Sequence, residues 1–155
     1  MGFGTIAAQT IMFISIIIVA TGLVFVYNSI MDDTSNSLRV QGELISNRIK
    51  TDLEIVSSSY DNDSQTVNVY VKNTGKTKLD IEKVDVFLDE KRIPRNDANR
   101  SIEVLPDTEI RNTGIWDPSE DIAIQIQRSL NDTSKHSVQV TTQYAISDID
   151  SFSLP

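Results

Sequence analysis

The chain has 155 residues, a formal net charge of −8 and no cysteine. Its acidic balance repels phosphate backbones and anionic lipid, so nucleic acid is not expected as a partner. The absence of cysteine excludes a disulfide framework and a thiolate metal site. The 14 basic and 22 acidic side chains all lie within residues 32–155, which divides the chain into an uncharged start and a charged remainder.

The uncharged start is long enough to cross a membrane. Residues 11–26 are almost wholly apolar, and a helix needs about 20 such residues to span the hydrocarbon. A cleaved secretory signal would have a basic region and a shorter apolar run, whereas here no Lys or Arg precedes Arg39. A buried core helix of a soluble protein is disfavoured by the same length and absence of charge. The sequence therefore predicts an uncleaved membrane helix over residues 5–31.

The charges that flank this helix bear on its orientation. Only the α-amino group precedes it, while Asp32 and Asp33 follow it. Positively charged flanks stay on the cytoplasmic side, but basic side chains also follow the helix from Arg39 onward, so the flanking charges alone leave the orientation open. We expect a single-pass protein of the cell membrane with its C-terminal domain outside, at the cell surface.

A second helical pattern follows from residue 32 to about 50. Leu38, Ile45 and Ile49 recur near a spacing of 3.6 residues with charged residues between them. The glycine at position 42 makes a helix here less stable by roughly 1 kcal/mol than alanine would. Two arrangements remain open: one continuous helix of ~68 Å over residues 5–50, or a membrane helix and a separate juxtamembrane helix. In both, residues 1–50 form a hydrophobic helix with an amphipathic stalk, and residues 51–155 form a separate domain.

After residue 51 the apolar residues alternate with polar ones, as in half-buried strands. Clusters of Asn, Asp, Gly, Pro and Ser separate these runs and indicate turns, one of them at residues 60–64. Six to eight short strands separated by turns predict an all-β sandwich resembling immunoglobulin domains. The expected strands are residues 53–59, 66–72, 84–88 (with 78–83 as an extension), 102–105, 122–127 and 138–144.

Catalytic chemistry has little support, and no enzyme, cofactor or metal centre is expected. His136 is the only histidine, and we expect it to be a surface residue. Residues 61–63 carry oxygen ligands at alternate positions but lack the glycine and distal glutamate of an EF-hand, so a solvated turn is the better interpretation. We expect Trp116 to be a core residue beneath a turn.

Three Asn-x-Ser/Thr sequences begin at Asn62, Asn99 and Asn131. All three fall in predicted loops, where a glycan can be attached. This placement favours an exported, glycosylated domain.

Several segments together resemble a known family. An uncharged helix opening with Met1 to Gly4 precedes a β-domain that contains residues 67–79, with the sequence VNVYVKNTGKTKL, and residues 112–120, with the sequence NTGIWDPSE. Residues 105–108 and 137–144 continue the likeness, which covers most of the chain. The arrangement resembles the archaellin-related accessory proteins of the archaeal flagellum, of the F or G type.

The resemblance implies a structural, non-enzymatic role in motility, with the C-terminal domain outside the membrane in the pseudoperiplasm or at the cell surface. F-type and G-type proteins are held to form the static part of the motor by joining the membrane to the S-layer. The implied partners are the S-layer protein, other archaellum accessory proteins, the membrane and further copies of the chain. Two alternatives remain: a filament subunit of the archaellin or minor-pilin kind, and an enzyme or solute-binding domain tethered by the helix.

One departure from the pattern concerns the N-terminus. Archaellins and pilins carry a short basic prepeptide that ends at a glycine, and no Lys/Arg-Gly junction precedes the helix here. Residues 2–8 also lack the glutamate that is common near the start of pilin-like helices. These differences lead us to expect unprocessed synthesis, which fits the F type better.

Overall fold

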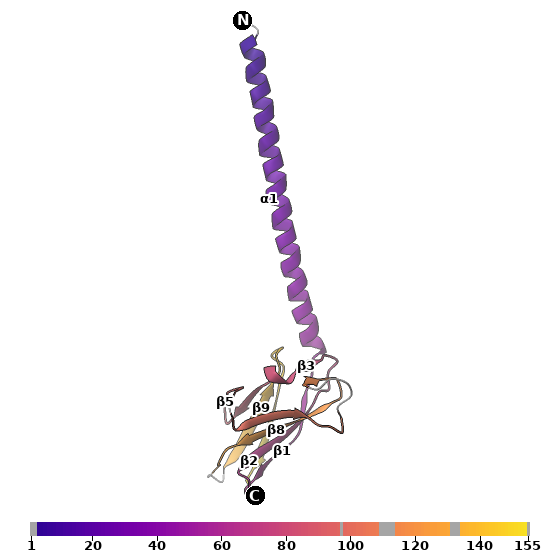
Figure 1. Ribbon diagram of the computed structural model, residues 1–155, viewed down its shortest axis with the longest axis vertical. Helices are drawn as coiled ribbons and strands as arrows, with labels where there is room; N and C mark the ends of the chain where they lie inside the picture. The colour runs from indigo at the N-terminus through magenta and orange to yellow at the C-terminus, as the bar shows by residue number, and fades with distance from the viewer. Residues whose placement is uncertain (1–2, 97, 109–113, 131–133, 155) are drawn as a thin grey trace. The chain divides into compact units, whose positions relative to one another are not determined.

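The computed structural model describes residues 3–96, 98–108, 114–130 and 134–154 (Figure 1). The chain forms two compact units, Met1–Glu43 and Leu44–Pro155. The predicted division at residue 50 coincides with the end of helix α1, and the last turns of that helix, from Leu44 to Lys50, belong to the second unit.

Helix α1 is one element from Phe3 to Lys50, which includes both the apolar run and the stalk. Its polar side chains within the apolar run are satisfied by the helix itself. The hydroxyls of Thr10, Ser15 and Thr21 donate to carbonyls four residues earlier, at 2.9, 2.8 and 2.9 Å. Such bonds remove the cost of placing a hydroxyl in an apolar medium.

The second unit is an antiparallel β-sandwich (Figure 1). One four-stranded sheet has the order β1-β2-β8-β6, the other has the order β10-β9-β4-β5, and β3 and β7 form a small two-stranded sheet. The described strands are β1 Glu54–Asp61, β2 Thr66–Lys72, β3 Leu79–Asp80, β4 Asp85–Leu88, β5 Lys91–Ile93, β6 Arg100–Val104, β7 Ile115–Trp116, β8 Asp121–Gln127, β9 Lys135–Thr141 and β10 Ser147–Ser153.

The core lies between the two large sheets, and alternation within each strand fills it. Each fully buried aliphatic side chain contributes roughly 1.5–3 kcal/mol of transfer free energy. The predicted inward faces of β2, β4 and β8 are confirmed by side chains exposed to 2 % or less: Val67, Val69, Val71, Val86, Leu88, Ile122, Ile124 and Ile126. The all-β sandwich predicted from the alternating pattern is therefore confirmed.

Two local predictions are wrong. Residues 78–83 do not extend β4, because Asp80 accepts a bond from the amide of Glu82 at 3.0 Å and starts the short 3₁₀-helix η1, Ile81–Lys83. The turn expected at residues 60–64 begins later, since Tyr60 is a buried residue within β1. The short strands β5 and β7 and the longer strand β10 were not predicted at all.

Candidate assembly surfaces

The loop after β2 holds the C-terminal end of helix α1. The amide of Lys76 donates to the carbonyl of Lys50 at 2.7 Å, and the amide of Gly75 donates to the carbonyl of Asp52 at 3.1 Å. The Thr77 hydroxyl lies 3.4 Å from the carbonyl of Asn47. The last carbonyls of a helix have no partner within the helix, so this loop supplies one of the missing donors. We call residues 73–77 the helix clamp.

Gly75 allows the clamp to approach this closely. A Cβ atom at position 75 would lie 2.4 Å from the amide nitrogen of Asp52 and 2.7 Å from the carbonyl oxygen of Lys50. Both are backbone atoms, which cannot turn aside as the end of a long side chain can. A side chain at this position therefore requires the loop and the helix end to separate.

Asn73, the first residue of the clamp, is completely buried and holds the loop in its conformation. Its side-chain amide donates to the carbonyls of Thr77 at 2.9 Å and Trp116 at 3.2 Å, and its side-chain oxygen accepts from the amide of Gly75 at 3.1 Å. A buried amide must be satisfied in this way to be tolerated. Asn73 thus sets the shape of the clamp and ties it to the strand that contains Trp116.

The segment around Trp116 completes this network. Trp116 is fully buried, as predicted, and its indole nitrogen donates to the carbonyl of Glu120 at 2.7 Å. The buried Glu120 carboxylate accepts from the amide of Asp117 at 2.7 Å, and Asp117 pairs with Lys78 at 2.8 Å. The two segments that carry the family resemblance therefore pack against each other, a contact that sequence reasoning missed.

The apolar part of α1 offers a different surface. One helix of the described chain, within Ile6–Lys50, is long and apolar enough to cross a membrane by length and composition. Its large apolar side chains are exposed in the first unit, including Phe25 at 77 %. Such a surface requires lipid or other apolar helices around it.

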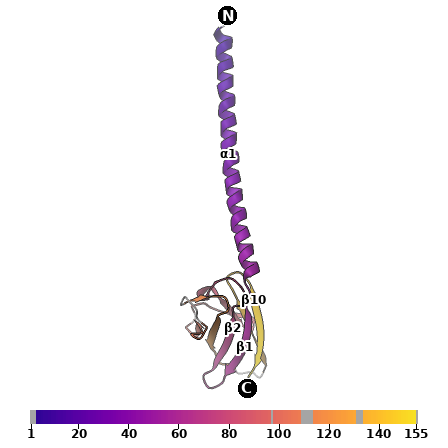
Figure 2. The same ribbon diagram turned by 90° about the vertical axis from the view of Figure 1, so that its right-hand side faces the viewer.

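Strands β1 and β10 face each other at one side of the sandwich (Figure 2). They are joined by carboxylates instead of a main-chain ladder. Asp148 accepts from the amide of Ile55 at 2.8 Å, and Asp150 accepts from the hydroxyl of Ser58 at 2.5 Å. Inward-pointing charges of this kind block the addition of a further strand at an edge. This side of the sandwich is therefore closed.

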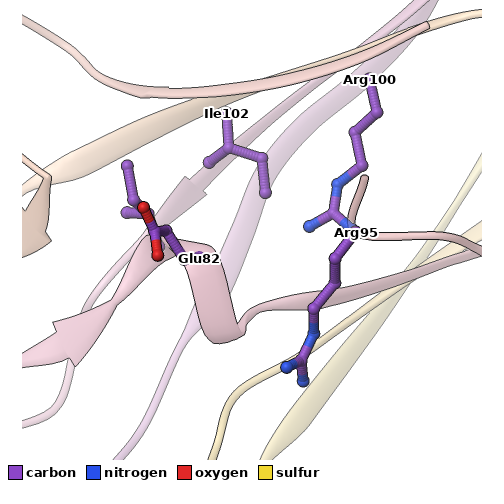
Figure 3. Close-up of a pocket in the computed structure, with 5 residues that line it drawn as sticks. Glu82, Arg95, Arg100 and Ile102 are labelled. Carbon is purple, nitrogen blue, oxygen red and sulfur yellow. The ribbon is translucent and has the colours of Figure 1, made fainter. Parts of the chain in front are cut away.

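The opposite side has an opening of about 250 Å³ beside β6, lined by Ile81, Glu82, Arg95, Arg100 and Ile102. In Figure 3 the two arginines lie on one side of the opening and Glu82 lies on the other. Arg100 donates to the carbonyl of Val84 at 2.7 Å, which joins β6 to the other sheet.

Charged groups near this opening shift one another's pKa. Arg95 donates to both carboxylate oxygens of Asp85, at 3.0 and 2.8 Å, and Arg92 donates to the same carboxylate at 2.7 Å. The bond from Arg95 is the main reason that the pKa of Asp85 lies below its usual value, and it raises the pKa of Arg95. Nearby, Lys83 lowers the pKa of Asp80 across 3.0 Å.

His136 is buried, contrary to the expectation of a surface residue. Its side chain lies on the inward face of β9 with 4 % of the residue exposed. Its Nδ1 atom lies 2.8 Å from Asp89, and its ring packs against Phe152 at a centroid distance of 5.7 Å. The expectation failed because a polar ring can be buried when a carboxylate satisfies one of its nitrogens.

The predicted solvated turn at residues 61–63 is exposed, and Asp61 holds it together. The Asp61 carboxylate accepts from the Ser64 hydroxyl at 2.7 Å and from the Asp63 amide at 3.0 Å, and the Ser64 bond is the main cause of its lowered pKa. Within the described ranges, no group of three or more His, Cys, Asp or Glu side chains could hold a metal ion.

Two of the three predicted glycosylation sites lie within the described residues. Asn62 lies in the exposed turn after β1, and Asn99 is exposed just before β6. Asn131 lies outside the described residues.

Comparison with known proteins gives a match to the family model described as archaeal-type flagellin, over residues 2–152. An uncharacterised protein of Archaeoglobus fulgidus is 30 % identical over 87 residues. That match covers 53 % of this chain and 54 % of the relative, so this chain spans about half the length of the relative.

Two solved structures have the same fold at low sequence identity. The archaellum periplasmic stator protein FlaG from Sulfolobus acidocaldarius has a TM-score of 0.51 at 17 % identity, with 66 % of this chain and 99 % of that chain covered. The archaeal flagellum of Methanospirillum hungatei strain JF1 has a TM-score of 0.66 at 14 % identity, with 94 % and 91 % covered.

Proposed function

This chain belongs to the archaeal-type flagellin family, and we propose that within it the protein is a static component of the archaellum motor that joins the membrane to the S-layer. It is an archaellum-related structural protein, of a family and fold that serve structure and not catalysis. In this proposal α1 crosses the cell membrane once and the β-sandwich lies outside.

Mechanics supports a second attachment outside the membrane. A rotor turns a filament against the cell only if something fixed takes up an equal and opposite torque. A lone membrane helix diffuses in a fluid bilayer and cannot hold that torque. A domain bound to a rigid outer lattice can hold it, provided that the domain is firmly connected to its own helix.

The helix clamp is the observation that carries the proposal. Hydrogen bonds from Gly75 and Lys76 join the clamp to the end of α1, and Asn73 anchors the same loop in the sandwich. A force on the sandwich therefore reaches the helix end through bonded main chain and not only through the single covalent connection at residue 51. A flexible linker at this place would bend and twist, and it would not transmit the torque.

A filament-forming subunit is the second candidate. It is favoured by the likeness to the Methanospirillum hungatei flagellum, which covers 94 % of this chain and so includes both units. In that role the apolar helices of many copies would bundle in the core of a polymer. Other archaellum proteins and further copies of the chain are the partners proposed under both candidates.

Location and phenotype separate the two candidates. A functional tagged copy should stay with the membrane and S-layer fraction after archaella are sheared off, and the deletion strain should keep its filaments but lose effective swimming. Detergent-solubilised full-length protein should also sediment with isolated S-layer sheets. Regular incorporation of the tagged copy along sheared filaments would instead support the filament subunit, and normal swimming of the deletion strain would reject the stator.

We also propose that Asn62 and Asn99 carry N-glycans, because both are exposed in Asn-x-Ser/Thr sequences and our proposal puts their domain outside the cell. Mass spectrometry of the protein from its native membrane should find a modified peptide at each position. Unmodified peptides at both positions would contradict this assignment.

A further inference from the structure

Strand β6 is an edge strand, because no described strand pairs with its second side. Among the described strands it pairs only with β8. The amide of Leu105 donates to Asp121 and the carbonyl of Asn99 accepts from Gln127, which shows that the odd-numbered residues bond towards β8. In an antiparallel ladder the intervening residues point their main-chain groups the other way. The main-chain groups of Ile102 and Val104 therefore point away from the sheet.

The cavity of about 250 Å³ lies beside this edge, on the inward side of β6. Arg100 and Ile102 are two residues apart on the strand, so they share one face, and both line the cavity (Figure 3). A strand that paired with β6 would place a side chain opposite Ile102 on the same face. That side chain would enter the cavity.

The cavity wall determines which side chain fits. Ile81 and Ile102 supply apolar surface, and Arg95 lies at the far side from Glu82. Arg92 and Arg95 share the carboxylate of Asp85, and Arg100 and Glu82 also line the cavity, so three arginines stand against two carboxylates in this described cluster. A carboxylate on a short apolar stem matches such a wall, because guanidinium groups bind carboxylates through strong charge-assisted bonds.

We propose that the β6 edge and its cavity bind an extended, acidic segment of a partner protein, which adds as a strand to β6 and inserts one carboxylate side chain between Ile102 and Arg95. Main-chain pairing supplies affinity and the side-chain pocket supplies specificity, as in other strand-addition complexes. The closed β1–β10 side, where Asp148 and Asp150 occupy the edge, leaves β6 as the side of this sheet that accepts a strand. The site is independent of whether the chain serves as stator or filament subunit.

A peptide selection on the purified full-length protein in detergent tests this site. A library of nine-residue random peptides should yield binders that carry Glu or Asp at one fixed position. In a synthetic binder, replacement of that Glu by Gln should weaken binding about 10-fold, near the 1.4 kcal/mol expected for one lost charge-assisted bond. Methylation of alternate peptide amides should abolish binding in one register and be tolerated in the other, which is the signature of strand pairing.

Matched variants of the protein locate the site. Arg95→Gln should weaken binding about 10-fold and remove the preference for Glu over Gln, whereas Arg128→Gln, at an exposed position that neither lines the cavity nor belongs to the Asp85 cluster, should leave both unchanged. Circular dichroism melts of both variants control for folding. A selection that yields no acidic consensus, or binders unaffected by Arg95→Gln and by amide methylation, would overturn the proposal.

Discussion

The helix clamp makes Gly75→Ala the most informative single substitution. The added methyl group would lie 2.4 Å from the amide nitrogen of Asp52 and 2.7 Å from the carbonyl oxygen of Lys50. Real side chains do not approach main-chain atoms so closely, so the loop must move away from the helix end. Gly42→Ala is the matched control, because a Cβ at position 42 meets nothing within 4 Å.

The cost follows from the bonds that this movement breaks. The amides of Gly75 and Lys76 lose their acceptors on Asp52 and Lys50, and each such bond contributes about 0.5–1.5 kcal/mol net. With the strain of the displaced loop, we expect a loss of about 2–3 kcal/mol in the free energy of unfolding of the second unit. At roughly 4 °C per kcal/mol for a domain of this size, the melting temperature should fall by about 8–12 °C.

Trp116 is a suitable probe because it is the only tryptophan and is fully buried beside the clamp network. Its fluorescence should follow thermal and denaturant unfolding of the full-length protein in detergent. Gly75→Ala should melt earlier with an altered emission maximum, while Gly42→Ala, which replaces a helical glycine by a better helix former without meeting a neighbour, should not melt earlier than the wild type. A Gly75→Ala variant that melts within about 2 °C of the wild type would refute the close approach of loop and helix end.

Three further substitutions test the core, the network and the pH dependence. Ile124→Ala should cost about 2–5 kcal/mol because its side chain is fully buried, whereas Ile149→Ala, at a position 60 % exposed, should change the melting temperature little; equal effects would show that the strand faces are misassigned. Asn73→Ala should cost about 2–4 kcal/mol, since it leaves without a donor the carbonyls that the Asn73 amide now satisfies. An unchanged denaturant midpoint would show that Asn73 does not hold the clamp in place. The lowered pKa of Asp85 means that its stabilisation is present above the unfolded pKa of about 4 and is lost as pH falls through the folded value. Asp85→Asn should therefore be about 1 kcal/mol less stable than the wild type at pH 7, and this difference should shrink as pH falls below about 4; a difference that is the same at pH 7 and pH 2 would contradict the ion-pair account.

Alternation in the sequence was sufficient to assign the central strands. In β2 and β8 every second residue is Val or Ile, the burial of those residues follows the pattern, and a shift by one residue would expose all of them. The apolar start of α1 was equally clear, because length and absence of charge together leave few alternatives.

Strand β10 shows why the same reasoning failed elsewhere. Its inward positions are Asp148, Asp150 and Phe152, while Ile149 points outward, so the apolar residue marks the wrong face. Only the partners on β1, almost a hundred residues away in sequence, explain why these partly buried carboxylates face inward. No pattern within seven residues contains that information.

The candidate surfaces were predicted only in part for the same reason. Asn73 reads as an ordinary turn residue in sequence, and its role depends on a carbonyl at position 116 that the fold brings beside it. The cluster of Arg92, Arg95 and Asp85 likewise forms where β5 and the residues just after it fold back beside β4.

In the proposed membrane placement, the hydroxyls of α1 that bond within the helix determine what the surrounding acyl chains contact. Because Thr10, Ser15 and Thr21 donate to their own helix, these side chains present no hydroxyl donor to their surroundings. To the acyl chains, this part of the helix is a smooth cylinder that can spin about its axis without breaking a bond. Any resistance to spinning must then come from the other end of the chain or from apolar packing alone.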